Sequence, residues 1–76
     1  MDNHISTARM RLLEEHRTLL AAAREEIPKV EALLASETRP LHRPAITWRI
    51  RELQETVAYH ELQIENLLLS LDTTPL

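Results

Sequence analysis

The sequence predicts an all-α protein, a two-helix antiparallel hairpin that associates into a four-helix or larger bundle. Leu, Ala, Glu and Arg, which are strong helix formers, dominate the 76 residues. Glycine is absent, so turns that need a positive φ angle have no residue suited to them. Apolar residues recur at alternating spacings of three and four in two long segments, and this pattern is typical of helices packed along a seam.

The first helix is expected over about residues 7–36, with Ser6 or Thr7 as its N-cap. Pro28 lacks the N–H that would bond to the carbonyl of Arg24, so we expect a kink or a short break near these residues. The apolar phase continues across Pro28, which favours a kink over a separate third helix. The seam of this helix consists of Leu13, His16, Leu20, Ala23, Ile27, Val30 and Leu34.

The second helix is expected over about residues 44–71, after a tip loop over residues 37–43. Pro44 suits the first turn of a helix, where a missing N–H removes no hydrogen bond. The seam of this helix consists of Ile46, Ile50, Leu53, Val57, His60, Ile64, Leu67 and Leu71.

The two seams match if the chain folds back at Pro40. Leu34 and Ile46 lie equally far from Pro40, and every other seam residue of the first helix also finds a seam partner in this way. Two unrelated helices would not need matching registers, so the match predicts that they form one hairpin. In this register His16 and His60 do not face each other but lie about one turn apart across the interface.

The length of 76 residues limits the chain to one small domain, residues 1–76. We expect frayed ends over residues 1–5 and 73–76. Without cysteine there are no disulfides or thiolate metal sites, and self-association is the remaining way to bury more surface. The net charge of −3 argues against a general nucleic-acid binder. No apolar run is long enough for a membrane span or a signal peptide, so we expect a cytoplasmic protein.

Several large apolar residues fall outside the two seams, and a helix with two apolar faces favours two neighbours. We therefore expect a homo-oligomer, a dimer or higher, although scattered surface leucines also occur on monomers. The expected oligomer or partner interface consists of Leu12, Leu19, Leu33, Trp48, Tyr59, Leu62, Leu68 and Leu69.

Positive charge is concentrated at the tip and at the start of the second helix. Four of the nine basic residues lie between Thr38 and Arg51, together with His42 and without any acid. Arginine forks, a helix N-terminus and an aromatic ring can together bind a phosphate or nucleotide. The alternative is that these arginines keep the loop soluble and pair with glutamates of a neighbouring subunit. The expected anion-binding residues are Arg39, Arg43, Trp48, Arg49, Arg51 and Tyr59.

Nothing in the sequence indicates a metal, a cofactor or catalysis. His16 and His60 lack further ligands at a suitable spacing, so we interpret them as polar seam residues that fix the register. Glu14-Glu15 and Glu25-Glu26 diverge by about 100° around the helix, so neither pair forms a carboxylate dyad. No serine, histidine and acid form a nucleophile set.

The segment Arg49 to Leu71 contains the run R-I-x-E-L-x-x-x-V-A-Y-x-E-x-x-I-E-x-L and resembles the SlyX family of short bacterial coiled coils. In length and two-helix layout the chain also resembles co-chaperones of type III secretion needle subunits. Leu53 to Tyr59 is similar to the L-E-E-A-x-x-W helix of phage sponge proteins that sequester cyclic-nucleotide signals, and Tyr59 would match the aromatic position.

We therefore predict a non-enzymatic, oligomeric binding protein. The leading hypothesis is that it captures a small anionic ligand, such as a nucleotide signal, at the arginine-rich tip. One alternative is a protein-interaction module, such as a co-chaperone, an adaptor or an assembly factor, that uses its second apolar face. Another is a purely structural coiled coil.

Overall fold

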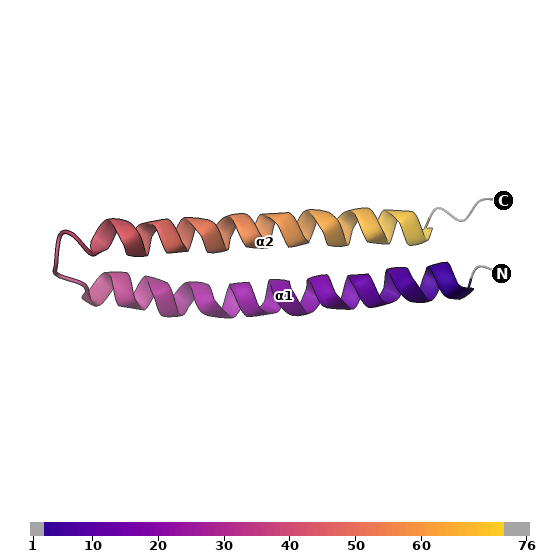
Figure 1. The fold of residues 1–76 in the computed structure, drawn as a ribbon, viewed down its shortest axis with the longest axis horizontal. Coiled ribbons are helices and arrows are strands. Elements are labelled where there is room, and N and C mark those ends of the chain that lie inside the picture. Colours follow the sequence, from indigo (N-terminus) through magenta and orange to yellow (C-terminus); the bar gives the residue numbers. More distant parts are fainter. Residues whose placement is uncertain (1–2, 73–76) are drawn as a thin grey trace.

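A computed structural model describes residues 3–72, with side-chain environments for residues 7–71. It contains two α-helices, α1 (Asn3–Ser36) and α2 (Arg43–Asp72), joined by a loop. The helices run antiparallel, so the start of α1 and the end of α2 lie together at one end of the molecule (Figure 1). The loop lies at the opposite end. The predicted all-α helical hairpin is therefore confirmed.

The helices are slightly longer than expected from the sequence. Because α1 begins at Asn3, Ser6 and Thr7 lie inside the helix, and the prediction that one of them is the N-cap was wrong. Residues 3–5, which the sequence predicts to be part of a frayed end, belong to α1. The ends expected to fray over residues 1–2 and 73–76 lie outside the described residues.

One apolar seam joins the two helices. Every described side chain that the sequence assigns to the seam is buried or half-buried, whereas most other side chains are exposed. One buried cluster of the seam contains residues of both helices that lie at matching distances from Pro40. It consists of Ala23, Val30 and Leu53, with Ile27, Ile46, Ile50 and Val57 packed against them.

His16 and His60 meet directly across this seam. Their Nδ1 atoms lie 2.8 Å apart, and their ring centroids lie 5.0 Å apart. The expectation that the two histidines do not face each other was wrong, because their imidazole rings are in direct contact. His60 is only 8% exposed. One ring must donate and the other accept, so at least one of them is neutral in this arrangement.

Helix α1 passes through Pro28 without a break. Figure 1 shows no sharp bend at this point, so the expected kink or break is absent. The proline side chain is exposed, and the carbonyl of Arg24 that it leaves without an N–H partner belongs to an equally exposed residue. Ala23 and Val30, on either side of the proline, are both buried in the seam, and they hold the two halves of α1 on one line.

The molecule is a thin rod that measures 60 × 15 × 13 Å. Its radius of gyration is 17.5 Å, compared with about 11 Å for a compact domain of this length. Its accessible surface of 6110 Å² is about 1300 Å² larger than that of a compact monomer of this mass. Each helix shields only one side of the other, so among the described residues no large side chain is completely buried.

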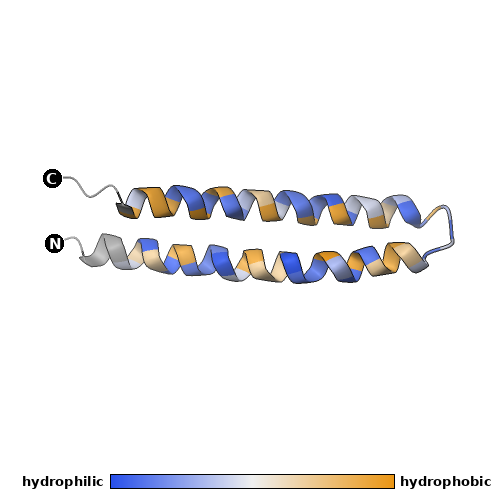
Figure 2. Cartoon of the chain, turned by 180° about the vertical axis from the view of Figure 1, so that it is seen from behind, coloured by the Kyte–Doolittle hydropathy of each residue, from blue (hydrophilic) through white to orange (hydrophobic). Residues whose placement is uncertain are grey.

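Hydrophobic and hydrophilic residues alternate along both helices, and neither helix is uniformly polar outside the seam (Figure 2). Within the described residues, neither helix has an apolar stretch long enough to cross a membrane.

Replacing Pro28 by alanine should stabilise the hairpin. Alanine restores the N–H that bonds to Arg24 and removes the ring from the helix interior, where proline costs about 3 kcal/mol relative to alanine. We expect the free energy of unfolding to rise by about 1–3 kcal/mol in urea titrations followed by circular dichroism at one protein concentration. Lys29→Ala, at the neighbouring exposed position, serves as the control and should change it by less than about 0.5 kcal/mol. An unchanged value for P28A would contradict this account of α1.

Candidate functional site

The loop over residues 37–42 is tied to both helices by backbone hydrogen bonds. The N–H of Glu37 donates to the carbonyl of Leu34 at 3.2 Å, which extends the end of α1. The N–H of His42 donates to the carbonyl of Arg39 at 3.1 Å, and the N–H of Ile46 donates to the carbonyl of His42 at 3.3 Å. The loop therefore turns the chain into α2 without a glycine.

Glu37 holds the loop through a fork of hydrogen bonds from Arg39. Its Oε1 atom accepts from the backbone N–H of Arg39 at 2.9 Å and from Nε at 2.8 Å, and its Oε2 atom accepts from Nη2 at 3.1 Å. The side-chain hydrogen bonds of Arg39, followed by its backbone N–H, lower the pKa of Glu37 from 4.5 to about 2. The same hydrogen bonds raise the pKa of Arg39.

This pair changes the interpretation of the tip. The sequence places no acid between Thr38 and Arg51, but Glu37 lies just before that segment and neutralises Arg39. Sequence reasoning missed Glu37 because its contact depends on the path of the loop and not on a helical spacing. The Glu37 side chain is only 9% exposed, and its hydrogen bonds hold Arg39 at the loop, although the Arg39 side chain is 67% exposed.

Arg43 also has a structural role. Its Nη1 atom donates to the carbonyls of Leu34 and Glu37, at 3.1 and 2.8 Å. The carbonyl of Leu34 lies in the last turn of α1, where N–H partners are few, and that of Glu37 directly follows the helix. Arg43 therefore caps the C-terminus of α1, a position at which many helices use glycine.

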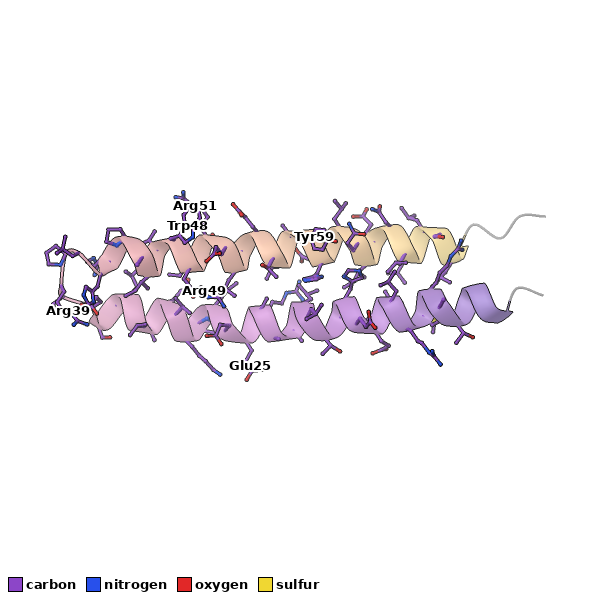
Figure 3. The ribbon with its side chains drawn as sticks, in the orientation of Figure 1. Glu25, Arg39, Trp48, Arg49, Arg51 and Tyr59 are labelled. Atoms are coloured by element: carbon purple, nitrogen blue, oxygen red, sulfur yellow. The ribbon has the colours of Figure 1, made fainter. Side chains whose placement is uncertain are left out.

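A shallow surface hollow of about 480 Å³ lies where the loop meets α2. It is lined by Pro40, Arg43, Pro44, Thr47, Trp48 and Arg51. The hollow therefore brings together three of the six residues expected to bind an anion: Arg43, Trp48 and Arg51. Among the described residues, Arg51 has no ion-pair partner, and its side chain and that of Trp48 point away from α1 (Figure 3).

The other three expected residues lie elsewhere. Arg39 is bound to Glu37, and Arg49 does not line the hollow but lies 4.0 Å from the carboxylate of Glu52. Tyr59 lies eleven residues beyond Trp48, which is about 16 Å along the helix. Its ring contacts that of His60 edge-on, with the centroids 5.1 Å apart, and its centroid lies 6.1 Å from that of His16.

The residues expected to form an oligomer interface are all exposed in the single chain: Leu12, Leu19, Leu33, Trp48, Tyr59, Leu62, Leu68 and Leu69. Those on α1 recur at intervals of seven or fourteen residues, as do Trp48, Leu62 and Leu69 on α2. Because seven residues are close to two helical turns, each set follows one side of its helix. We call Trp48, Leu62 and Leu69 the outer stripe of α2.

Arg24 and Glu61 form a salt bridge between the helices, at 2.6 Å. A hollow of about 370 Å³ lies next to this bridge and includes Leu68 and Leu69 in its wall. Among the described residues, no group of three or more histidines, cysteines or acids is placed to hold a metal ion. In the described part of the chain, this surface therefore offers a partner apolar side chains and salt-bridged charges.

Comparisons of the chain with protein-family models, with curated proteins and with solved structures find no match. The resemblances to the SlyX family, to the sponge proteins and to the secretion co-chaperones therefore stay predictions.

Glu37 should titrate well below the ordinary range of a glutamate. Because its folded pKa is lowered to about 2, the contact with Arg39 stabilises the loop above pH 4.5 and is lost as the pH falls towards 2. We expect carboxyl-carbon NMR to give a midpoint near pH 2, and Arg39→Gln to move it back towards 4.5. Arg17→Gln, remote from the tip, is the control and should leave it unchanged. A wild-type midpoint near 4.5 would refute the Glu37–Arg39 contact.

Proposed function

We propose that this hairpin acts by binding, as a self-associated helical protein-interaction module, and not by catalysis. The observation that carries the proposal is the exposed apolar surface of α1 and α2. Among the described residues, nine large hydrophobic side chains of the two helices are more than two-fifths exposed. So many exposed apolar groups along two helices are typical of a surface that another helix covers.

The energetics of the seam support the same conclusion. A small single core rarely supplies more than about 3–5 kcal/mol of stability, and small proteins usually add disulfides, a metal or oligomerisation. The chain has no cysteine, and its described residues form no metal-binding group. Association adds the missing buried surface, and a dimer of hairpins is the simplest product.

Negative charge on the outer stripe should weaken self-association. We expect Leu62→Glu combined with Leu69→Glu to weaken self-association by at least about 2 kcal/mol, because both carboxylates would have to enter an apolar interface. Sedimentation equilibrium measures the effect, and circular dichroism checks that the variant remains helical. The matched control is Leu41→Glu, since Leu41 is 90% exposed and lies in the loop. A wild-type chain that stays monomeric at all concentrations would refute the proposal.

A second candidate function is the capture of a small anion at the tip. The supporting observation is the hollow that places Arg51 and the Arg43 side chain beside Trp48 at the start of α2. Free N–H groups and the helix dipole favour anions at this end of a helix. Because Arg39 and Arg43 already hold the loop, Arg51 would supply most of the available charge for a phosphate.

Trp48 is the only tryptophan, so its fluorescence reports directly on this hollow. If the tip binds anions, a titration with inorganic phosphate and with mono-, di- and cyclic nucleotides should give a saturable change for one class. Arg51→Gln should then weaken binding by about tenfold, as expected for the loss of a hydrogen bond to a charged group. Arg17→Gln is the control. No saturable change with any of these ligands would rule out this candidate.

A further inference from the structure

We propose that two copies of this chain pair antiparallel along the outer stripe of α2, around a two-fold axis beside Ala58. The inference rests on the proposed function, which is self-association. It adds the surface on which the copies meet, their relative direction and the residues that determine it.

The charges beside the outer stripe are self-complementary. Arg51, Ala58 and Glu65 follow one another at intervals of seven, so they form one row along α2, and all three are exposed. Arg51 and Glu65 carry opposite charges and lie about 10 Å from Ala58 in opposite directions along the helix. A two-fold axis beside Ala58 therefore brings Arg51 of each copy to Glu65 of the other, and the ion pair forms twice.

Neither charge has a partner within the described part of the chain. Arg51 and Glu65 take part in no ion pair among these residues, although four other arginines do: Arg17, Arg24, Arg39 and Arg49. Arg51 points away from α1 in Figure 3, as a contact with a second copy on this face requires. A parallel arrangement would place Arg51 against Arg51, so the charges favour the antiparallel one.

The apolar residues follow the same symmetry. Trp48 lies ten residues before Ala58, and Leu69 of the same stripe lies eleven residues after it. The two-fold axis therefore places the indole of each copy, which is 61% exposed, against Leu69 of the other. Ala58 at the centre has the smallest side chain of the row. Because the distance between packed helices depends on the side chains at their contact, this alanine lets the two copies of α2 approach closely. Glu55 interrupts the stripe, and its methylene groups would lie against Leu62 of the second copy.

The available surface matches what a stable pair needs. The stripe from Trp48 to Leu69 extends about 31 Å along α2. The chain exposes about 1300 Å² more than a compact monomer of its mass. A standard protein interface buries about 800 Å² on each partner, so the excess is large enough for one such interface.

Helix α1 offers a weaker alternative. Glu15, Ala22 and Lys29 have the same spacing of seven. Lys29, however, is already 3.8 Å from Glu25 of its own helix. The leucines of α1 are also interrupted, because Glu26 occupies the position between Leu19 and Leu33. The face of α2 therefore has both the unpaired charges and the larger apolar groups.

Charge reversal tests this pairing. Arg51→Glu and Glu65→Arg should each weaken self-association by about tenfold or more, because each creates two like-charge contacts. The double variant R51E/E65R should associate like the wild type. An equimolar mixture of the two single variants should form a heterodimer, since one copy then carries two acids where the other carries two arginines. Sedimentation equilibrium measures all four, and circular dichroism confirms that each remains helical.

Lys29→Glu reverses a charge on α1 and is the matched control. Loss of association in the two single variants, its return in the double variant and an unaffected K29E would support the pairing. Unchanged association of R51E and E65R would overturn it, while self-association itself would stand. An effect of K29E alone would overturn it in favour of the α1 face. A monomeric wild type would instead refute the proposed function on which the pairing rests.

Discussion

The contact between α1 and α2 along a single seam is the constraint on which the rest of this structure depends. Two helices shield each other over one side only, so the opposite side of each remains on the surface. The core is correspondingly narrow, and only half-buried side chains pack against its cluster of Ala23, Val30 and Leu53. The length of the rod, the exposed leucines and the proposed second interface all follow from this two-helix geometry.

The fold could be predicted because it depends on periodicity. Spacings of three and four determine which residues enter a seam, and their match around Pro40 determines that both seams belong to one hairpin. Pro28 is a position at which the local sequence pattern gives the wrong prediction. Its local effect predicts a kink, but the buried Ala23 and Val30 on either side hold α1 against α2. Packing against a neighbouring helix is not visible in a local sequence pattern.

The tip could be predicted only in part, for a related reason. Composition locates the positive charge, but the path of the loop decides which charges remain available. Arg39 is bound by Glu37, and Arg43 is used to cap α1. Tyr59 was grouped with the tip by its aromatic character, yet it lies with the histidines of the seam. A residue type predicts which chemistry is possible, whereas hydrogen bonds decide whether the group is free to perform it.

Trp48 and Arg51 belong to two of the surfaces proposed above. They line the hollow at the tip, and they lie on or beside the outer stripe of α2. An anion bound in the hollow and a second copy on the stripe would therefore contact the same two side chains. If both events occur, they are coupled, and ligand binding changes the affinity of the chains for each other by the same factor as association changes the affinity for the ligand.

The histidine pair limits how the two helices can slide. Heptad seams built only from aliphatic side chains tolerate a shift by one repeat, because one leucine replaces another at each level. Such a shift would separate His16 from His60 and leave two imidazoles facing hydrocarbon without a polar partner, at a cost of about 1–3 kcal/mol for each unsatisfied group. The 2.8 Å contact between them therefore favours one helix register over the others. It selects one register from a repeating pattern and keeps the loop, the capped end of α1 and the outer face of α2 in a fixed relation.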